Sequence, residues 1–151
     1  MPPREQHRLR RRTPRTEVAW KHYSDLVSLA ENSDYLVAAC PGGPATRHIV
    51  NAEVLAALGQ QGFFINIARG SVVDTAALID ALDREVIAGA ALDVIEGEPV
   101  VPEGLLKSPK VLMTPHMAGR TPDVIWSQVK LFVANVEAVL GGNPAPNVAP
   151  A

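Results

Sequence analysis

Short apolar runs alternate with amphipathic stretches through most of the chain. Four runs are apolar almost throughout, as is typical of strands covered on both faces of a parallel sheet. They span residues 34–40, 62–67, 87–94 and 111–114. Apolar residues recur at helical spacing in four other stretches, at 24–32, 51–58, 75–84 and 122–140. This alternation indicates right-handed βαβ units and predicts an incomplete doubly wound, Rossmann-like α/β parallel sheet with flanking helices.

Three of these helices carry recognisable start signals. Asn51 and Asp74 precede the second and third helices, where their side chains are expected to accept hydrogen bonds from free amides. Thr121 is the expected cap of the last helix, and Pro122 opens it. The helix should end at Gly141-Gly142.

Charge is distributed unevenly along the chain: the N-terminal segment, or head, is strongly basic, and the remainder is net acidic. Residues 1–15 hold six arginines and one glutamate, while the remainder holds 8 basic and 15 acidic residues. The head could be a transit peptide or a nucleic-acid-binding arm, but it lacks a long amphipathic pattern and interleaved aromatic residues, so a solvated terminus is expected. We therefore predict a basic segment at 1–15, a partial nucleotide-binding domain at 16–142 and an extended tail at 143–151, with neither a nucleic acid nor a membrane as partner.

The single cysteine, Cys40, excludes an internal disulfide and favours a reducing compartment, with the cytoplasm as the expected location.

Three polar residues follow three successive predicted strands: Arg69, Glu98 and His116. The carboxyl ends of parallel strands share one edge of a sheet, where open α/β sheets bind ligands. An arginine there can grip a planar carboxylate through two parallel hydrogen bonds. A carboxylate beside an imidazole orients the ring and favours its protonated form, which gives a proton donor and acceptor.

Simpler interpretations stay open for each of these residues. Arg69 can be a surface arginine after a strand, a histidine after a strand can be merely packed or hydrated, and Glu98-Pro99 can be a plain turn. No metal is expected, since one histidine and one distant glutamate do not supply three ligands at recognisable spacing. Cys40 lacks a designated base and is not expected to be a nucleophile.

Three motifs in order resemble the D-isomer-specific 2-hydroxyacid dehydrogenases, most closely their glyoxylate/hydroxypyruvate reductase branch. The motifs are Ile-Ala-Arg-Gly-Ser-Val-Val-Asp at 67–74, Gly-Ala-Ala-Leu-Asp-Val-Ile-Glu-Gly-Glu-Pro at 89–99 and Thr-Pro-His-Met-Ala-Gly at 114–119. The similarity extends from about Arg12 to about Val148. It implies that Arg69 binds the carboxylate of a small 2-oxo acid, His116 is the acid/base and Glu98 is its partner.

The same resemblance implies a nicotinamide cofactor and reduction of a 2-oxo acid to the D-2-hydroxy acid. The residues expected at the cofactor are Arg12, Cys40, Pro41, Thr46, Ile67, Ala68, Asp93, His116 and Gly119. Asp93 would face the nicotinamide carboxamide, and Thr46 with the backbone of Cys40, Pro41 and Ile67 would contact phosphate and ribose. Arg11-Arg12, with no acid nearby, favours NADPH over NADH.

One family feature is missing: the sequence has no Gly-x-Gly-x-x-Gly turn for the pyrophosphate. We therefore expect the first strand, most of the second and the substrate domain to precede Met1, whether through gene truncation, a late start or a deliberate fragment. In the strand order 3-2-1-4-5-6, this predicts a gap between the strands at 35–39 and 63–67.

These departures limit what the chain should do alone. Full-length relatives are expected to be homodimers, whereas this chain should self-associate and lack measurable dehydrogenase activity. The alternative is a non-catalytic nucleotide-sensing or protein-interaction module, similar to a corepressor, or the remnant of a truncated gene.

Overall fold

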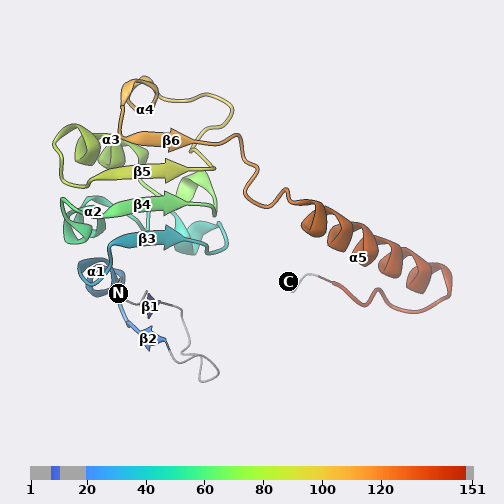
Figure 1. Ribbon diagram of the computed structural model, residues 1–151. Coiled ribbons are helices and arrows are strands. Elements are labelled where there is room, and N and C mark those ends of the chain that lie inside the picture. Colours follow the sequence, from blue (N-terminus) through green and yellow to red (C-terminus); the bar gives the residue numbers. More distant parts are fainter. Residues whose placement is uncertain (1–7, 11–19, 149–151) are drawn as a thin grey trace, which may run out of the picture. The chain divides into compact units, whose positions relative to one another are not determined.

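A computed structural model describes residues 8–10 and 20–148 of the chain (Figure 1). The described residues form two compact units, one ending at Pro115 and the other beginning at His116. The first unit is an α/β layer structure, and the second is built on one long helix.

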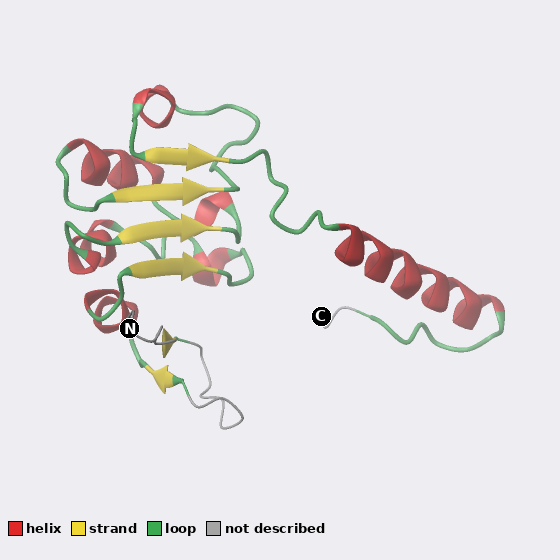
Figure 2. Cartoon of the chain, in the orientation of Figure 1, coloured by secondary structure: helices red, strands yellow, loops and turns green. Residues whose placement is uncertain are grey.

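Four parallel strands form the sheet of the first unit, in the order β3-β4-β5-β6. Their bounds are Tyr35–Ala38 for β3, Phe63–Asn66 for β4, Gly89–Leu92 for β5 and Val111–Met113 for β6. Figure 2 shows all four arrows pointing the same way, so the carboxyl ends share one edge. The predicted fold class is confirmed.

The predicted gap within this sheet is wrong. β3 pairs directly with β4, and the register runs from Tyr35 opposite Phe63 to Ala38 opposite Asn66. A single helix connects the two strands, and consecutive parallel strands linked in this way are usually neighbours in the sheet. The prediction had placed 35–39 on the far side of the missing strands, although its chain connection to β4 favours direct pairing.

Four helices accompany the sheet: α1 at Leu26–Glu31, α2 at Ala52–Leu58, α3 at Thr75–Asp83 and α4 at Glu103–Lys107. Two short 3₁₀ turns, η1 at Pro44–Thr46 and η2 at Gly70–Val72, precede α2 and α3. The predicted caps are confirmed, because Asn51 accepts from the amide of Val54 and Asp74 accepts from those of Ala76 and Ala77. The helix α4 was not predicted.

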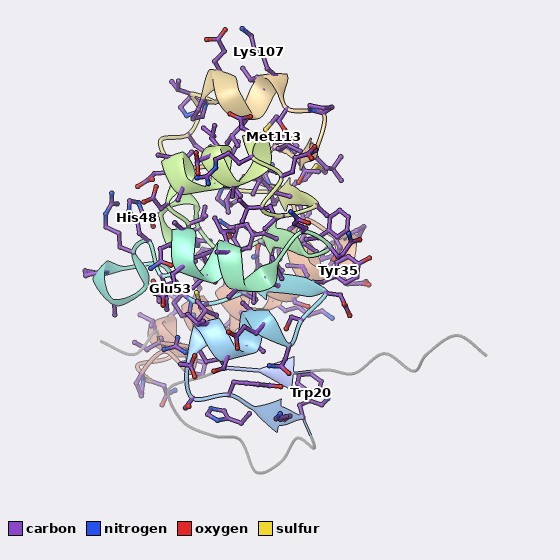
Figure 3. The ribbon with its side chains drawn as sticks, turned by 90° about the vertical axis from the view of Figure 1, so that its left-hand side faces the viewer. Trp20, Tyr35, His48, Glu53, Lys107 and Met113 are labelled. Atoms are coloured by element: carbon purple, nitrogen blue, oxygen red, sulfur yellow. The ribbon has the colours of Figure 1, made fainter. Side chains whose placement is uncertain are left out.

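The core of the first unit lies between one face of the sheet and helices α1 to α3. Leu36, Phe64 and Leu92 point from the strands into this core. On the other face of the sheet, Tyr35 is 64% and Leu112 is 67% exposed. Figure 3 shows Tyr35 on the side of the unit opposite to His48. Within this unit the sheet is therefore buried on one face, whereas the sequence predicted cover on both.

A second, very short sheet joins β1, Arg8–Leu9, to β2, Lys21–His22, in parallel. The sequence pattern did not predict it. The proposed 2′-phosphate residue, Arg12, lies outside the described residues.

The second unit consists of α5, Pro122–Leu140, and the segment that follows it. Thr121 caps α5 by accepting from the amide of Val124 at 3.3 Å, as predicted. The segment after the helix folds back on it, because the amide of Asn147 donates to Oδ1 of Asn135 at 3.0 Å. None of the described helices combines the length and apolarity that crossing a bilayer requires.

Candidate functional site

Arg69 lies on a turn that a buried asparagine organises. Asn66, the last residue of β4, is fully buried, and its Nδ2 donates to the carbonyl of Arg69 at 3.0 Å. Its Oδ1 accepts from the amide of Ala68, also at 3.0 Å. Both ends of the amide are thus satisfied by the turn that leads out of the strand. Sequence reasoning missed Asn66, although a polar residue at the end of an apolar strand was a visible signal.

The side chain of Arg69 is exposed and held on two sides. Nη1 donates to the carbonyl of Ala68 at 2.6 Å. A Cβ atom added to Gly42 would lie 2.7 Å from Cγ of Arg69, so only glycine there leaves room for the arginine stem. The remaining guanidinium N–H groups are available for a planar anion.

The loop after β3 is closed by Thr46. Its hydroxyl lies 2.8 Å from the carbonyl oxygen of Pro41 and 3.2 Å from that of Gly43. The loop therefore has a fixed shape next to Arg69, with Cys40 half-buried and Pro41 exposed. The structure gives Thr46 a part in shaping this loop, whereas the sequence suggested only contact with phosphate or ribose.

Asp93 joins the ends of β4, β5 and β6. It is 6% exposed, and its Oδ1 accepts a hydrogen bond of 2.5 Å from the Thr114 hydroxyl. Its amide donates to the carbonyl of Asn66 at 2.9 Å. A buried carboxylate at a sheet edge has capacity for more than one donor.

Glu98 lies on the loop that leaves β5, and its Oε1 accepts from the amide of Ile95 at 2.7 Å. This loop lies directly against the Arg69 turn. A Cβ atom added to Gly70 would lie 2.1 Å from the carbonyl carbon of Ile95, a distance that no side chain permits. The structure thus brings the Arg69 and Glu98 segments into backbone contact.

A further carboxylate, which the sequence did not single out, lies on the same loop. Glu96 is 2.9 Å from Nη2 of Arg47 and 3.0 Å from Nε2 of His48. These contacts hold the pKa of Glu96 below its ordinary value of 4.5, mainly through the hydrogen bond from His48 and against the effect of partial burial. The sequence signal was Glu-Gly-Glu itself, which offered two carboxylates where only one was assigned.

His116 is the first residue of the second unit, and Gly119 belongs to the same unit. His116 is exposed and has a left-handed backbone, with φ at 52°. The pairing of His116 with Glu98 stays a prediction of the sequence.

The residues at this edge fit one end of a nicotinamide dinucleotide. Asp93 is a buried carboxylate of the kind that a carboxamide N–H requires as acceptor, and its amide is hydrogen-bonded to Asn66, which precedes Ile67 and Ala68 in the chain. No glycine-rich turn for the pyrophosphate occurs in the sequence. Within the described ranges, no three His, Cys, Asp or Glu side chains are grouped so that they could hold a metal ion.

Comparisons with known proteins identify the family of the chain. The chain matches a family model described as the NAD binding domain of D-isomer specific 2-hydroxyacid dehydrogenases, over residues 6–118. It is 47% identical to glyoxylate/hydroxypyruvate reductase A of Arabidopsis thaliana, over 87% of this chain and 42% of that protein. It is 44% identical to hydroxyphenylpyruvate reductase of Plectranthus scutellarioides, over 88% of this chain and 42% of that protein.

A solved structure shows the same fold. The NADPH-dependent glyoxylate/hydroxypyruvate reductase of Sinorhizobium meliloti, in complex with NADP and malonate, superposes with a TM-score of 0.89 at 42% identity. The match covers 95% of this chain and 46% of that one. The chain thus spans less than half the length of these relatives. It belongs to the D-isomer-specific 2-hydroxyacid dehydrogenase family, of which it carries the NAD-binding domain region.

Proposed function

We propose that this chain supplies the catalytic residues of an NAD(P)H-dependent reductase that converts a small 2-oxo acid to the D-2-hydroxy acid. The observation that supports this most is the exposed Arg69 side chain at the carboxyl end of β4, whose stem lies against Gly42 and whose guanidinium donates to the Ala68 carbonyl. The glyoxylate and hydroxypyruvate reductases among the relatives support the same substrate class.

Each residue has a defined part in the proposed reaction. Arg69 binds the substrate carboxylate and thereby fixes the position of the keto carbon at the carboxyl edge of the sheet. His116 gives a proton to the carbonyl oxygen, and Glu98 orients the imidazole for that transfer. The cofactor, when bound, supplies the hydride, so hydride and proton together reduce C=O to CH–OH. Charge develops on the carbonyl oxygen during the reaction, and a proton donor placed there lowers the barrier.

Cofactor contacts form part of the same proposal. Asp93 is assigned to the carboxamide, and Cys40, Pro41, Thr46, Ile67, Ala68 and Gly119 to the cofactor side of the site. NADPH is the proposed preference, supported by the NADP complex of the Sinorhizobium meliloti reductase and by Arg12. A cytoplasmic location is proposed as well, because Cys40 is the single cysteine of the chain.

The test begins with the 151-residue chain. Glyoxylate is titrated into labelled protein with NADPH present, and amide resonances of residues 68–71 are followed. Arg69→Lys should weaken the response several-fold, because a lysine offers a point charge in place of a planar fork. Arg84→Lys is the matched control, since Arg84 pairs with Asp80 at the end of α3, away from the carboxyl ends of the strands.

Turnover is measured in parallel by the loss of reduced-nicotinamide absorbance with glyoxylate and hydroxypyruvate. The chain alone is expected to show none. Equal responses in the Arg69→Lys and Arg84→Lys variants would remove the substrate assignment. Nucleotide binding without any response to 2-oxo acids would favour the alternative, a non-catalytic nucleotide-sensing module.

A further inference from the structure

Three loops meet at the carboxyl edge of the sheet, outside the residues already assigned to chemistry. The first is the β3–α2 connection, which contains Arg47 and His48. The second follows β4 and contains Gly70 and Ser71. The amide of His48 donates to the carbonyl of Ser71 at 2.8 Å, which joins the first two loops through their backbones.

Glu96, on the third loop, connects to both of the others through its side chain. Nε2 of His48 lies 3.0 Å from each carboxylate oxygen, and Nη2 of Arg47 lies 2.9 Å from Oε1. The Thr75 hydroxyl, at the start of α3, is 3.5 Å from Oε2. Hydrogen bonds to a charged carboxylate are shorter and stronger than neutral ones.

The backbone of His48 gives a second, independent observation. Its φ of 49° lies in the left-handed region, which residues other than glycine adopt only in a small minority of cases. A backbone conformation of this kind persists where the surrounding contacts hold it, and such positions cluster at functional sites. Here the left-handed backbone coincides with an imidazole in contact with both oxygens of Glu96.

The third observation is the close approach at Gly70. An added Cβ would lie 2.3 Å from the amide nitrogen of Glu96, so the backbones of the second and third loops are in direct contact. Glu98 lies two residues after Glu96, and its carboxylate accepts from the amide of Ile95, the residue before Glu96. The position of the Glu98 carboxylate therefore depends on how residues 95 and 96 are held.

We propose that Glu96, gripped by His48 and Arg47, is a positioning residue that fixes the Ile95–Glu98 loop against the Arg69 turn. It sets where the carboxylate of Glu98 lies relative to the guanidinium of Arg69. The catalytic consequence rests on the proposed function, but the positioning itself can be measured without cofactor or substrate.

The experiment follows the amide resonance of Ile95 during an acid titration of the labelled 151-residue chain. Protonation of Glu98 weakens the acceptor of this amide, so the resonance shifts as the pH falls. In Glu98→Gln the side chain at position 98 no longer titrates, so the shift that this variant loses is the contribution of Glu98. If Glu96 positions the loop, Glu96→Gln should reduce that part at least two-fold.

His48→Asn gives the same test without changing any residue of the Ile95–Glu98 loop. Asparagine tolerates the left-handed backbone, but its shorter side chain does not reach Glu96. It should therefore also reduce the Ile95 shift at least two-fold, while the resonances of the core residues Leu55 and Phe64 stay in place. Glu85→Gln is the matched control, because Glu85 is likewise paired with a cation, Lys110, at 2.8 Å but lies elsewhere.

An unchanged Ile95 titration in either folded variant, Glu96→Gln or His48→Asn, would overturn the proposal. So would a reduction of the same size in Glu85→Gln. Failure of the proposed function leaves these outcomes unaffected, because the readout involves neither NADPH nor a 2-oxo acid.

Discussion

The buried side chain of Asn66 holds the backbone turn that carries Arg69. Replacing Asn66 with alanine leaves the buried Ala68 amide without its acceptor and removes one of the two donors to the Arg69 carbonyl, which also accepts from the amide of Val72. We expect Asn66→Ala to lower the free energy of unfolding by about 1–3 kcal/mol, the cost of unsatisfied buried polar groups. The measurement is urea denaturation. Asn32→Ala, which removes one exposed hydrogen bond to Ser28, should cost less than about 0.5 kcal/mol, and equal costs would contradict this account.

Glu96 makes stability depend on pH in a defined direction. Its pKa in the folded chain is depressed, chiefly by the hydrogen bond from His48 and further by the positive charges of His48 and Arg47. The stabilisation that the ionised Glu96 contributes is therefore fully present above pH 4.5, the ordinary pKa of this group. It is lost as the pH falls through the depressed pKa of the folded chain. Glu96→Gln should lower the free energy of unfolding at about pH 7 by less than roughly 1 kcal/mol.

The difference between wild type and Glu96→Gln should shrink towards zero at about pH 3, as measured by denaturation at both pH values. A difference that grew on acidification would contradict this assignment.

Local chemistry in the sequence predicted Arg69, Asp74 and Glu98 at their places, because each follows or caps an element with a clear pattern. It could not predict the contact between His48 and Glu96, which are 48 residues apart. Nor could it show that Gly42 and Gly70 are needed for close packing, because that requirement arises only when three loops meet.

At the scale of elements, the β3–α2–β4 crossover is the part in which prediction and structure differ most. The strands and the Asn51 cap were predicted, because apolar runs and caps are local signals. The direct pairing of β3 with β4 was not, since strand order depends on the whole sheet. The helix α4 was missed because its five residues are too few for a periodic pattern.

The crossover can be tested through its central side chain. Leu55 of α2 is fully buried in the core, so Leu55→Ala should cost about 2–5 kcal/mol of unfolding free energy. Leu106→Ala is the control, because Leu106 is 61% exposed on α4 and its loss should cost less than about 0.5 kcal/mol. Denaturation with urea measures both. A small cost at Leu55 would mean that α2 does not cover the sheet as described.

For the molecule as a whole, self-association remains a prediction, although the gap that first suggested it does not exist, because within the first unit one face of the sheet is uncovered. Tyr35 and Val37 are exposed on β3, at the edge of the four-stranded sheet. A lysine on such a strand opposes edge pairing. Val37→Lys should therefore shift the 151-residue chain towards the monomer in light scattering. Val100→Lys, at a loop position that is 73% exposed, should not, and equal shifts would assign association to another surface.

The order of the sheet also has a consequence for synthesis on the ribosome. Each strand from β4 onwards pairs with the strand that immediately precedes it in the chain. When a new strand emerges, its partner has already left the exit tunnel together with the helix that joins them. The first unit can thus grow one βα step at a time, without waiting for a distant segment. Besides the outer edge of β3, its nascent form would expose only the edge of the most recent strand, which limits the time available for misfolding.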